Sequence, residues 1–174
     1  MSDGIRYPIG RFQYREPTPA LRRSLIAQFA DAPGLLRAAV EGLDGEQLLT
    51  RYREDGWTVA QVVHHVAESD VNAYPRLKYA LTEDNPAVLV AQQDLWAALP
   101  DAQSAALESS LALFEAIRGR WVEAWMAVGD AGFSRAWTHP RYGRLTVDHV
   151  LQQYAWHALH HTEQIIGLRR RMGW

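Results

Sequence analysis

Four long stretches of this sequence carry apolar residues at the three- and four-residue spacing of an amphipathic α-helix. They cover approximately residues 18–43, 58–81, 104–128 and 146–171, and little of the remaining chain shows the alternation that is typical of strands. Each such helix has to bury an apolar stripe, and four helices can do so around one shared core. We therefore expect an all-α helical bundle that forms a single domain over residues 1–174.

Capping residues mark where three of these helices begin. Thr18, Thr58 and Thr146 each start a periodic stretch, and a threonine side chain at that position accepts a hydrogen bond from a free backbone N–H group. Pro33 and Pro75 lie inside two of the stretches. Because proline removes one helical hydrogen bond, we expect a kink or break at each of them.

Three segments outside these helices are expected to have other forms. Residues 1–16 predict a short extended N-terminal arm, and residues 83–100 predict a long connection with a short helical piece near Trp96. Residues 137–145 contain a His-Pro dipeptide and a glycine, which predicts a small turn or hairpin directly before the last helix.

Composition excludes several classes of partner and chemistry. The 174 residues are 48% hydrophobic and 22% charged, and a formal net charge of −2 gives no reason to expect nucleic acid or an anionic membrane as partner. Cysteine is absent, so the chain itself offers neither a disulfide nor a thiolate. No apolar run is long enough for a transmembrane helix or a secretion signal, and the cytoplasm is the expected location.

Two histidines of the last helix, His157 and His161, lie one turn apart at the edge of its apolar stripe. Residues at i and i+4 are neighbours on a helix surface, so both imidazoles can reach one metal ion, as in known zinc motifs with this spacing. His149 and His160 are expected to point away from that edge. On pattern alone, the pair could equally belong to an ordinary core.

A third histidine, His65, is expected to face this pair from the second helix. It forms a polar row with Ser69, Asn72 and Arg76 beside the apolar stripe, whereas His64 lies on the opposite side. A polar row next to a core face is typical of a pocket wall inside a bundle. Three imidazoles with one open position are the ligand set of a catalytic divalent metal site, while structural zinc sites normally have four protein ligands.

Asp70 is unusual because it projects from the middle of the apolar stripe of the second helix. A buried carboxylate is costly unless it is paired, hydrogen-bonded or close to a cation. It could orient an imidazole, act as a fourth metal ligand or serve as a general base, and it could also form a salt bridge to an arginine. Among these roles, we take the general base as the catalytic assignment.

Four segments of the chain resemble one known family. The opening IRYPIGRF, the segment GWTVAQVVHHVAESDVNAYPRLKYALTEDNP, the segment YAWHALHHTEQI and the ending RRRMGW are similar to the YfiT branch of the DinB/YfiT-like superfamily. The resemblance extends over nearly the whole chain and implies an up-and-down four-helix bundle. It also implies one divalent ion, zinc or nickel, on a histidine of the second helix and an i, i+4 pair of the fourth, which here are His65, His157 and His161.

Partners and activities follow from the same resemblance. Proteins of this branch are generally homodimers that are catalogued as candidate metal-dependent hydrolases, and relatives in the superfamily transfer a low-molecular-weight thiol such as bacillithiol to electrophiles. The aromatic segment 7–14 is a candidate dimer contact. Close relatives tend to have histidine where this chain has Asp70, and some have a further histidine at Gln164, so the preference for metal or substrate could differ.

Three functions are compatible with these residues. The leading hypothesis is thiol transfer, in which the metal stabilises a small-molecule thiol as thiolate, Asp70 or a metal-bound hydroxide accepts the proton, and Asn72 and Arg76 hold polar or anionic parts of that thiol. The second is hydrolysis of an ester or amide by metal-activated water. The third is a non-enzymatic dimer that binds a metal or a small ligand, because resemblance of fold does not by itself decide the chemistry.

Overall fold

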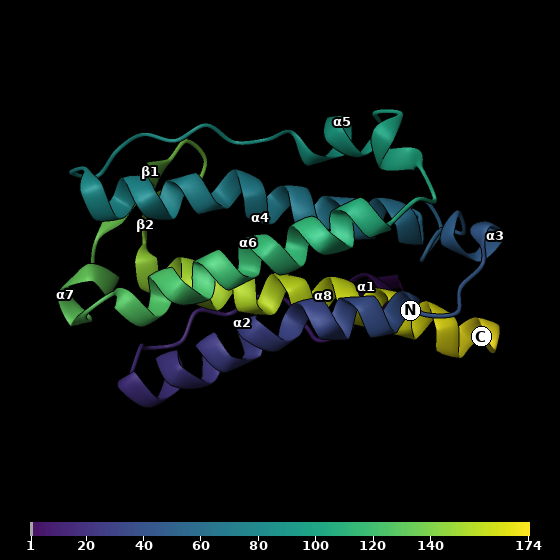
Figure 1. Ribbon diagram of the computed structural model, residues 1–174, viewed down its shortest axis with the longest axis horizontal. Helices are drawn as coiled ribbons and strands as arrows, with labels where there is room; N and C mark the ends of the chain where they lie inside the picture. Colours follow the sequence, from purple (N-terminus) through teal and green to yellow (C-terminus); the bar gives the residue numbers. More distant parts are fainter. Residues whose placement is uncertain (1) are drawn as a thin grey trace.

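The computed structural model describes residues 2–174, and four long helices dominate it (Figure 1). These helices, α2, α4, α6 and α8, correspond to the four predicted stretches, so the predicted all-α four-helix bundle is confirmed. In chain order, the elements are α1 (Ser2–Arg6), α2 (Pro19–Val40), α3 (Gly45–Leu48), α4 (Val59–Thr82), α5 (Gln93–Ala97), the 3₁₀ helix η1 (Asp101–Gln103), α6 (Glu108–Ala127), α7 (Asp130–Phe133), β1 (Ala136–His139), β2 (Gly143–Thr146) and α8 (Val147–Met172).

The order of the helices around the bundle differs from simple up-and-down alternation. Both α2 and α4 pack between α6 and α8, so α2 and α4, although consecutive long helices, lie diagonally opposite. In addition, α4 and α6 run in the same direction (Figure 1). The cause is the long connection 83–107, which carries the chain back to the end of the bundle where α4 begins.

The capping threonines mark where the helices begin, but the internal prolines do not interrupt them. The side-chain oxygens of Thr18, Thr58 and Thr146 each accept a hydrogen bond of 3.1 Å from a backbone N–H three residues later, as predicted. The expected breaks at Pro33 and Pro75 do not occur, because α2 and α4 continue through them. Each proline removes one hydrogen bond, and the packing of a 22- or 24-residue helix along the core offsets that loss.

The N-terminal arm lies along α8 and is not wholly extended, because residues Ser2–Arg6 form the short helix α1. Its aromatic side chains pack on histidines of α8. The ring of Tyr7 stacks on His160 at a centroid distance of 5.6 Å, and that of Phe12 meets His149 edge-on at 5.3 Å. The aromatic segment suggested as a dimer contact therefore packs within its own chain, and dimerisation stays a prediction.

The predicted small hairpin before the last helix is present. Strands β1 and β2 pair antiparallel with Trp137 opposite Leu145, and β1 packs against α4. Trp137 is buried in the core, so the hairpin is fixed to the bundle and its turn lies beside the larger of two cavities described below. None of the described helices has both the length and the apolar character that a membrane span requires.

Candidate metal centre

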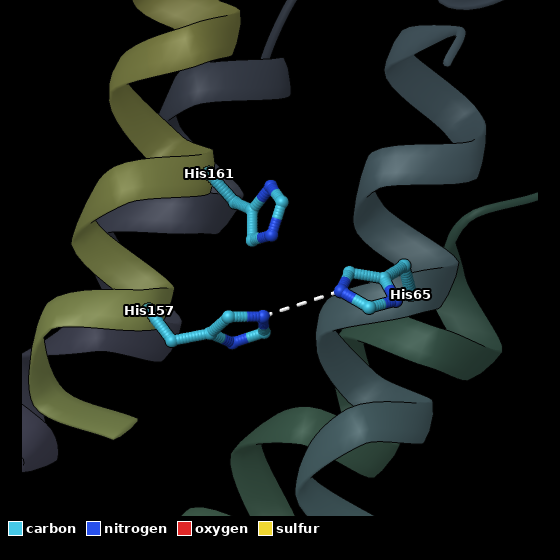
Figure 2. A group of neighbouring side chains, drawn as sticks. All are labelled: His65, His157 and His161. Carbon is cyan, nitrogen blue, oxygen red and sulfur yellow. Dashed lines mark hydrogen bonds between the residues drawn. The ribbon is translucent and has the colours of Figure 1, made fainter. Parts of the chain in front are cut away.

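The three histidines predicted as metal ligands come together between α4 and α8 (Figure 2). His65 of α4 and His157 of α8 point toward one another, with their Nε2 atoms 3.2 Å apart. His161 lies one turn further along α8, and one nitrogen from each of the three rings lies within 4.8 Å of both others. The structure therefore contains the convergence that helical periodicity predicted.

This geometry fits one divalent ion. Two imidazole nitrogens bound at 2.0–2.1 Å to a tetrahedral zinc ion are about 3.3 Å apart, and the Nε2 atoms of His65 and His157 are 3.2 Å apart. Burial lowers the pKa of His65 to about 4 and lowers the pKa values of His157 and His161 well below the ordinary histidine value, and neighbouring histidines add to each shift. The rings are therefore neutral near pH 7 and can offer lone pairs to a cation.

Gln164 fixes the ring of His161 from behind. The Nδ1 atom of His161 donates a hydrogen bond to Oε1 of Gln164 at 2.8 Å, which leaves Nε2 free as a metal ligand. The amide nitrogen of Gln164 donates to the backbone carbonyl of Arg6 at 2.8 Å and lies 3.0 Å from Nε2 of His160. Gln164 therefore connects the metal centre to the N-terminal segment.

His160 lies closer to the centre than its position on α8 predicts. Its ring is 4.9 Å from that of His161, stacks on Trp156 at 4.5 Å and lines one of the two cavities at the site. Its ring is nevertheless not one of the three that converge, and Tyr7 of the N-terminal arm covers it, a contact that the pattern of α8 alone cannot show. His64 is directed elsewhere, as predicted, since its ring contacts the side chain of a serine on α6.

Asp70 is directed at Arg118 of α6 and forms a buried ion pair with it. Both carboxylate oxygens accept hydrogen bonds from the guanidinium group, one of them at 3.1 Å, and the two side chains are 0% and 1% exposed. Burial raises the pKa of Asp70 and lowers that of Arg118, while each charge opposes the shift of the other. Of the roles considered for Asp70, the salt bridge is the one that the structure shows. The side chain lines neither of the cavities at the histidines, so the structure does not support the general-base assignment, which stays a prediction.

Arg118 also connects the four long helices. Besides Asp70 of α4, its guanidinium group donates to the backbone carbonyls of Tyr154 in α8 at 3.1 Å and Phe29 in α2 at 3.5 Å. Its carbon Cζ lies 3.5 Å from the ring centroid of Phe29. The pair is therefore part of the structural core.

Two cavities meet at the histidines. The larger has a volume of about 660 Å³ and is walled by the polar row that the sequence predicted, including Ser69, Asn72 and Arg76. The smaller has a volume of about 240 Å³ and is lined by aromatic side chains and by His160 and His161. Four side chains line both cavities and mark where they join: His65, His157, Gln93 and Asp94.

Sequence reasoning missed two neighbours of the histidines. The ring of Trp57 lies 4.5 Å from that of His65 and stacks on His161 at 6.2 Å. Asp94, an exposed residue of the short helix α5, lines both cavities. Both belong to segments without helical periodicity, so no pattern in the sequence indicates which way they face.

Comparison with known proteins identifies the family. A sequence profile of the DinB superfamily matches residues 28–165. The chain belongs to the DinB superfamily. A protein of Geobacillus thermodenitrificans named "Putative metal-dependent hydrolase" is 44% identical over 178 residues, covering 99% of this chain and 98% of the relative. A protein of Bacillus cereus with the same name is 40% identical over 171 residues, covering 98% of each.

A solved structure is similar over the same extent. YfiT from Bacillus subtilis, described as a probable metal-dependent hydrolase with an unusual four-helix bundle topology, matches with a TM-score of 0.96 at 39% identity, covering 98% of this chain and 99% of that one. The resemblance found in the sequence is therefore confirmed. The relatives' names indicate a metal-dependent enzyme, and the three clustered histidines of this DinB-superfamily protein are the residues that could hold the metal.

Proposed function

We propose that this DinB-superfamily protein is a divalent-metal-dependent enzyme that transfers a low-molecular-weight thiol to an electrophilic small molecule. His65, His157 and His161 would hold the ion, either zinc or nickel. The observation that supports transfer is that two cavities meet at the same histidines. A transfer between two molecules needs a place for each of them at one reacting point, whereas hydrolysis needs a place for one substrate and for water.

The chemistry requires a bound thiol, because the chain contains no cysteine. A divalent ion on three neutral imidazoles supplies Lewis acidity, which favours the thiolate form of a nearby thiol. In the reaction, the thiol loses its proton and a bond forms between sulfur and the electrophilic carbon. The bond from that carbon to the leaving group then breaks, and the leaving group departs with the electron pair.

Residues around the histidines would position the reactants and move the proton. Asp94 lines both cavities at their junction, and we assign it to accept the thiol proton in place of Asp70. Asn72 and Arg76, joined by a hydrogen bond, lie in the larger cavity and would hold polar or anionic parts of the thiol. Trp57 would exclude water from the histidines on the side of the smaller cavity.

A direct assay tests the proposal. Protein loaded with zinc or nickel is mixed with bacillithiol and monochlorobimane, whose fluorescence rises when a thiol replaces its chloride. We expect a rate well above that of the metal-free protein and above that of the His157→Ala variant with the same metal added. A rate for the metal-loaded protein that equals both controls would end the thiol-transfer proposal.

Hydrolysis is the second candidate, and the names of the relatives favour it. Oxygen-18 from labelled water would appear in the product of hydrolysis but not in the product of thiol transfer. The third candidate, non-enzymatic metal or ligand binding, predicts that His65→Ala changes the melting temperature or the oligomeric state and alters no turnover. The proposal includes the homodimer that the resemblance implies, which analytical ultracentrifugation would test.

A further inference from the structure

The larger cavity carries positive charge at the end far from the histidines. Arg76, Arg141 and His139 all line it. Within residues 2–174, neither of these arginines forms a salt bridge. In contrast, Arg118, which is buried, and Arg22, which is partly buried, are each paired with a carboxylate. The two arginines of the cavity therefore lack the carboxylate partners that Arg22 and Arg118 have.

Arg76 shows this imbalance most clearly. Its side chain is half-buried in the cavity wall, and its hydrogen-bond partner there is the neutral amide oxygen of Asn72. Burial lowers the pKa of Arg76, which reflects the cost of removing its charge from water. A partly desolvated cation is stabilised strongly by an anion, and a guanidinium group matches the two oxygens of a carboxylate.

The hairpin adds two more hydrogen-bond donors to the cavity, the guanidinium group of Arg141 and the ring of His139. The Nδ1 atom of His139 accepts backbone hydrogen bonds from Arg141 at 3.1 Å and from Tyr142 at 3.2 Å, so the ring proton of the neutral form is on Nε2, which can donate to a ligand. Burial, followed by the charges of Arg76 and Arg141, lowers the pKa of His139. Elements distant in the sequence, α4 and the β1–β2 hairpin, thus contribute to one cluster (Figure 1).

Charge is divided along the cavity. Its two carboxylates lie at the histidine end: Asp94 lines the junction of the two cavities, and Glu68 lies about one turn from His65 on α4. The guanidinium group of Arg76 reaches the level of Asn72, seven residues beyond His65, which corresponds to about 10 Å along the helix axis. A molecule that fills the cavity would therefore place its negative end at the hairpin and its other end at the histidines.

We propose that Arg76, Arg141 and His139 bind the carboxylate of an elongated small-molecule substrate, whose reacting group lies about 10 Å away beside His65 and His157. The position of the reacting group rests on the proposed function, while the carboxylate site rests on the cationic cluster alone. The cavity volume of about 660 Å³ is of the size that holds a small metabolite. The hairpin thereby becomes the element that selects substrates by charge and length.

Chain length and charge can be tested together in cobalt-loaded protein, in which a thiolate on the metal gives an optical charge-transfer band. The probes are 8-mercaptooctanoate, the uncharged 8-mercaptooctanol of the same length, and 3-mercaptopropanoate, which is too short to reach both ends. We expect the long acid to bind at least about 10-fold more tightly than the long alcohol, because its carboxylate accepts charge-assisted hydrogen bonds. The short acid should show no such advantage over 3-mercaptopropanol.

Variants assign the advantage to the cluster. In the double variant Arg76→Gln/Arg141→Gln, the preference of the long acid over the alcohol should fall to within about 2-fold. The single change Arg141→Gln, at an exposed position, should give a partial loss, and it serves as the second variant if the double one fails to fold. Arg144→Gln is the matched control, because this exposed arginine lies on the same hairpin but does not line the cavity.

A probe without sulfur separates this site from the thiol-transfer proposal. Octanedioate and octanoate differ by one carboxylate, and calorimetry on the metal-loaded protein measures the binding of each. If no thiol gives the optical band but octanedioate keeps an advantage that the double variant loses, thiol transfer fails and the carboxylate site stands. Equal binding of acid and uncharged probes, or a preference that the double variant retains, overturns the carboxylate site.

Discussion

Two polar clusters lie inside the same bundle, and they differ in whether the chain completes them. In the first, Asp70 and Arg118 satisfy each other's charge, and Arg118 uses its remaining donors on backbone carbonyls. In the second, His65, His157 and His161 direct nitrogens at one point, and among residues 2–174 no carboxylate joins that group. Both clusters join α4 to other helices, but only the second opens on cavities.

The difference separates a cluster that supports the fold, Asp70 with Arg118, from a cluster that is a candidate for chemistry, the three histidines. A buried ion pair that the chain completes adds little net stability by itself. Removing one of its partners is strongly destabilising, because the other charge is then left buried and unpaired. A buried group that its chain leaves incomplete indicates an external partner, here a cation. Four changes test this contrast.

Removing the carboxylate of the closed pair should have the largest effect. Asp70→Ala leaves the guanidinium of Arg118 buried and unpaired, so we expect the free energy of unfolding to fall by about 3–5 kcal/mol in urea denaturation. The double variant Asp70→Leu/Arg118→Met should recover most of this loss, because it removes both charges. A loss below about 1 kcal/mol for Asp70→Ala would mean that the pair does not support the fold.

The open cluster should respond to metal instead. Zinc at about 100 times its dissociation constant should stabilise the protein by about 2.7 kcal/mol, measured by calorimetry, because a ligand of the folded state shifts the unfolding equilibrium. His157→Ala should abolish this gain, and His149→Ala, a histidine of α8 outside the cluster, should retain it. An equal gain in both variants would place the metal elsewhere.

Asp94 offers the sharpest contrast with Asp70. Because its side chain is exposed, Asp94→Asn should change the free energy of unfolding by less than about 0.5 kcal/mol. The rate of the proposed thiol transfer should nevertheless fall by about 100-fold, the lower end for loss of a general base. Unchanged rates at every pH would remove Asp94 from the reaction.

The smallest effect is expected behind the metal ligands. Gln164→Ala removes the acceptor that orients His161, and metal affinity in a chelator competition should fall by about 10–100-fold. Gln164→Glu keeps an acceptor for His161 while it loses the N–H donor to the carbonyl of Arg6, so it should retain most of the affinity. If both variants lose the same amount, the contact with Arg6 is the more important one.

The parts of this site that helix geometry alone determines were predictable. The spacing of His157 and His161 fixes their common face, and the polar row fixes the side of α4 on which His65 lies. The partner of Asp70 also left a signal, because Arg118 interrupts the stripe formed by Phe114 and Trp121 of α6 just as Asp70 interrupts that of α4. When two apolar stripes each contain one charged residue and the charges are opposite, the pattern predicts an ion pair between the two helices.

The remaining features depend on contacts between segments far apart in the sequence. The parallel direction of α4 and α6 follows from the path of the connection 83–107, which contains no long periodic segment. The same connection brings Asp94 to the histidines, and the N-terminal arm brings Tyr7 to His160. Local propensity cannot predict such placements, because tertiary packing decides them.

The hydrogen bond from Gln164 to the carbonyl of Arg6 has a practical consequence for anyone who handles this protein. Because the other end of the Gln164 side chain holds His161, one of the three candidate metal ligands, we expect a purification tag fused ahead of α1 to weaken metal binding although the tag lies far from these ligands in sequence. Preparations of the protein that differ only in their added leader peptides would then differ in metal content. Authentic activity is best measured after the added leader has been cleaved off.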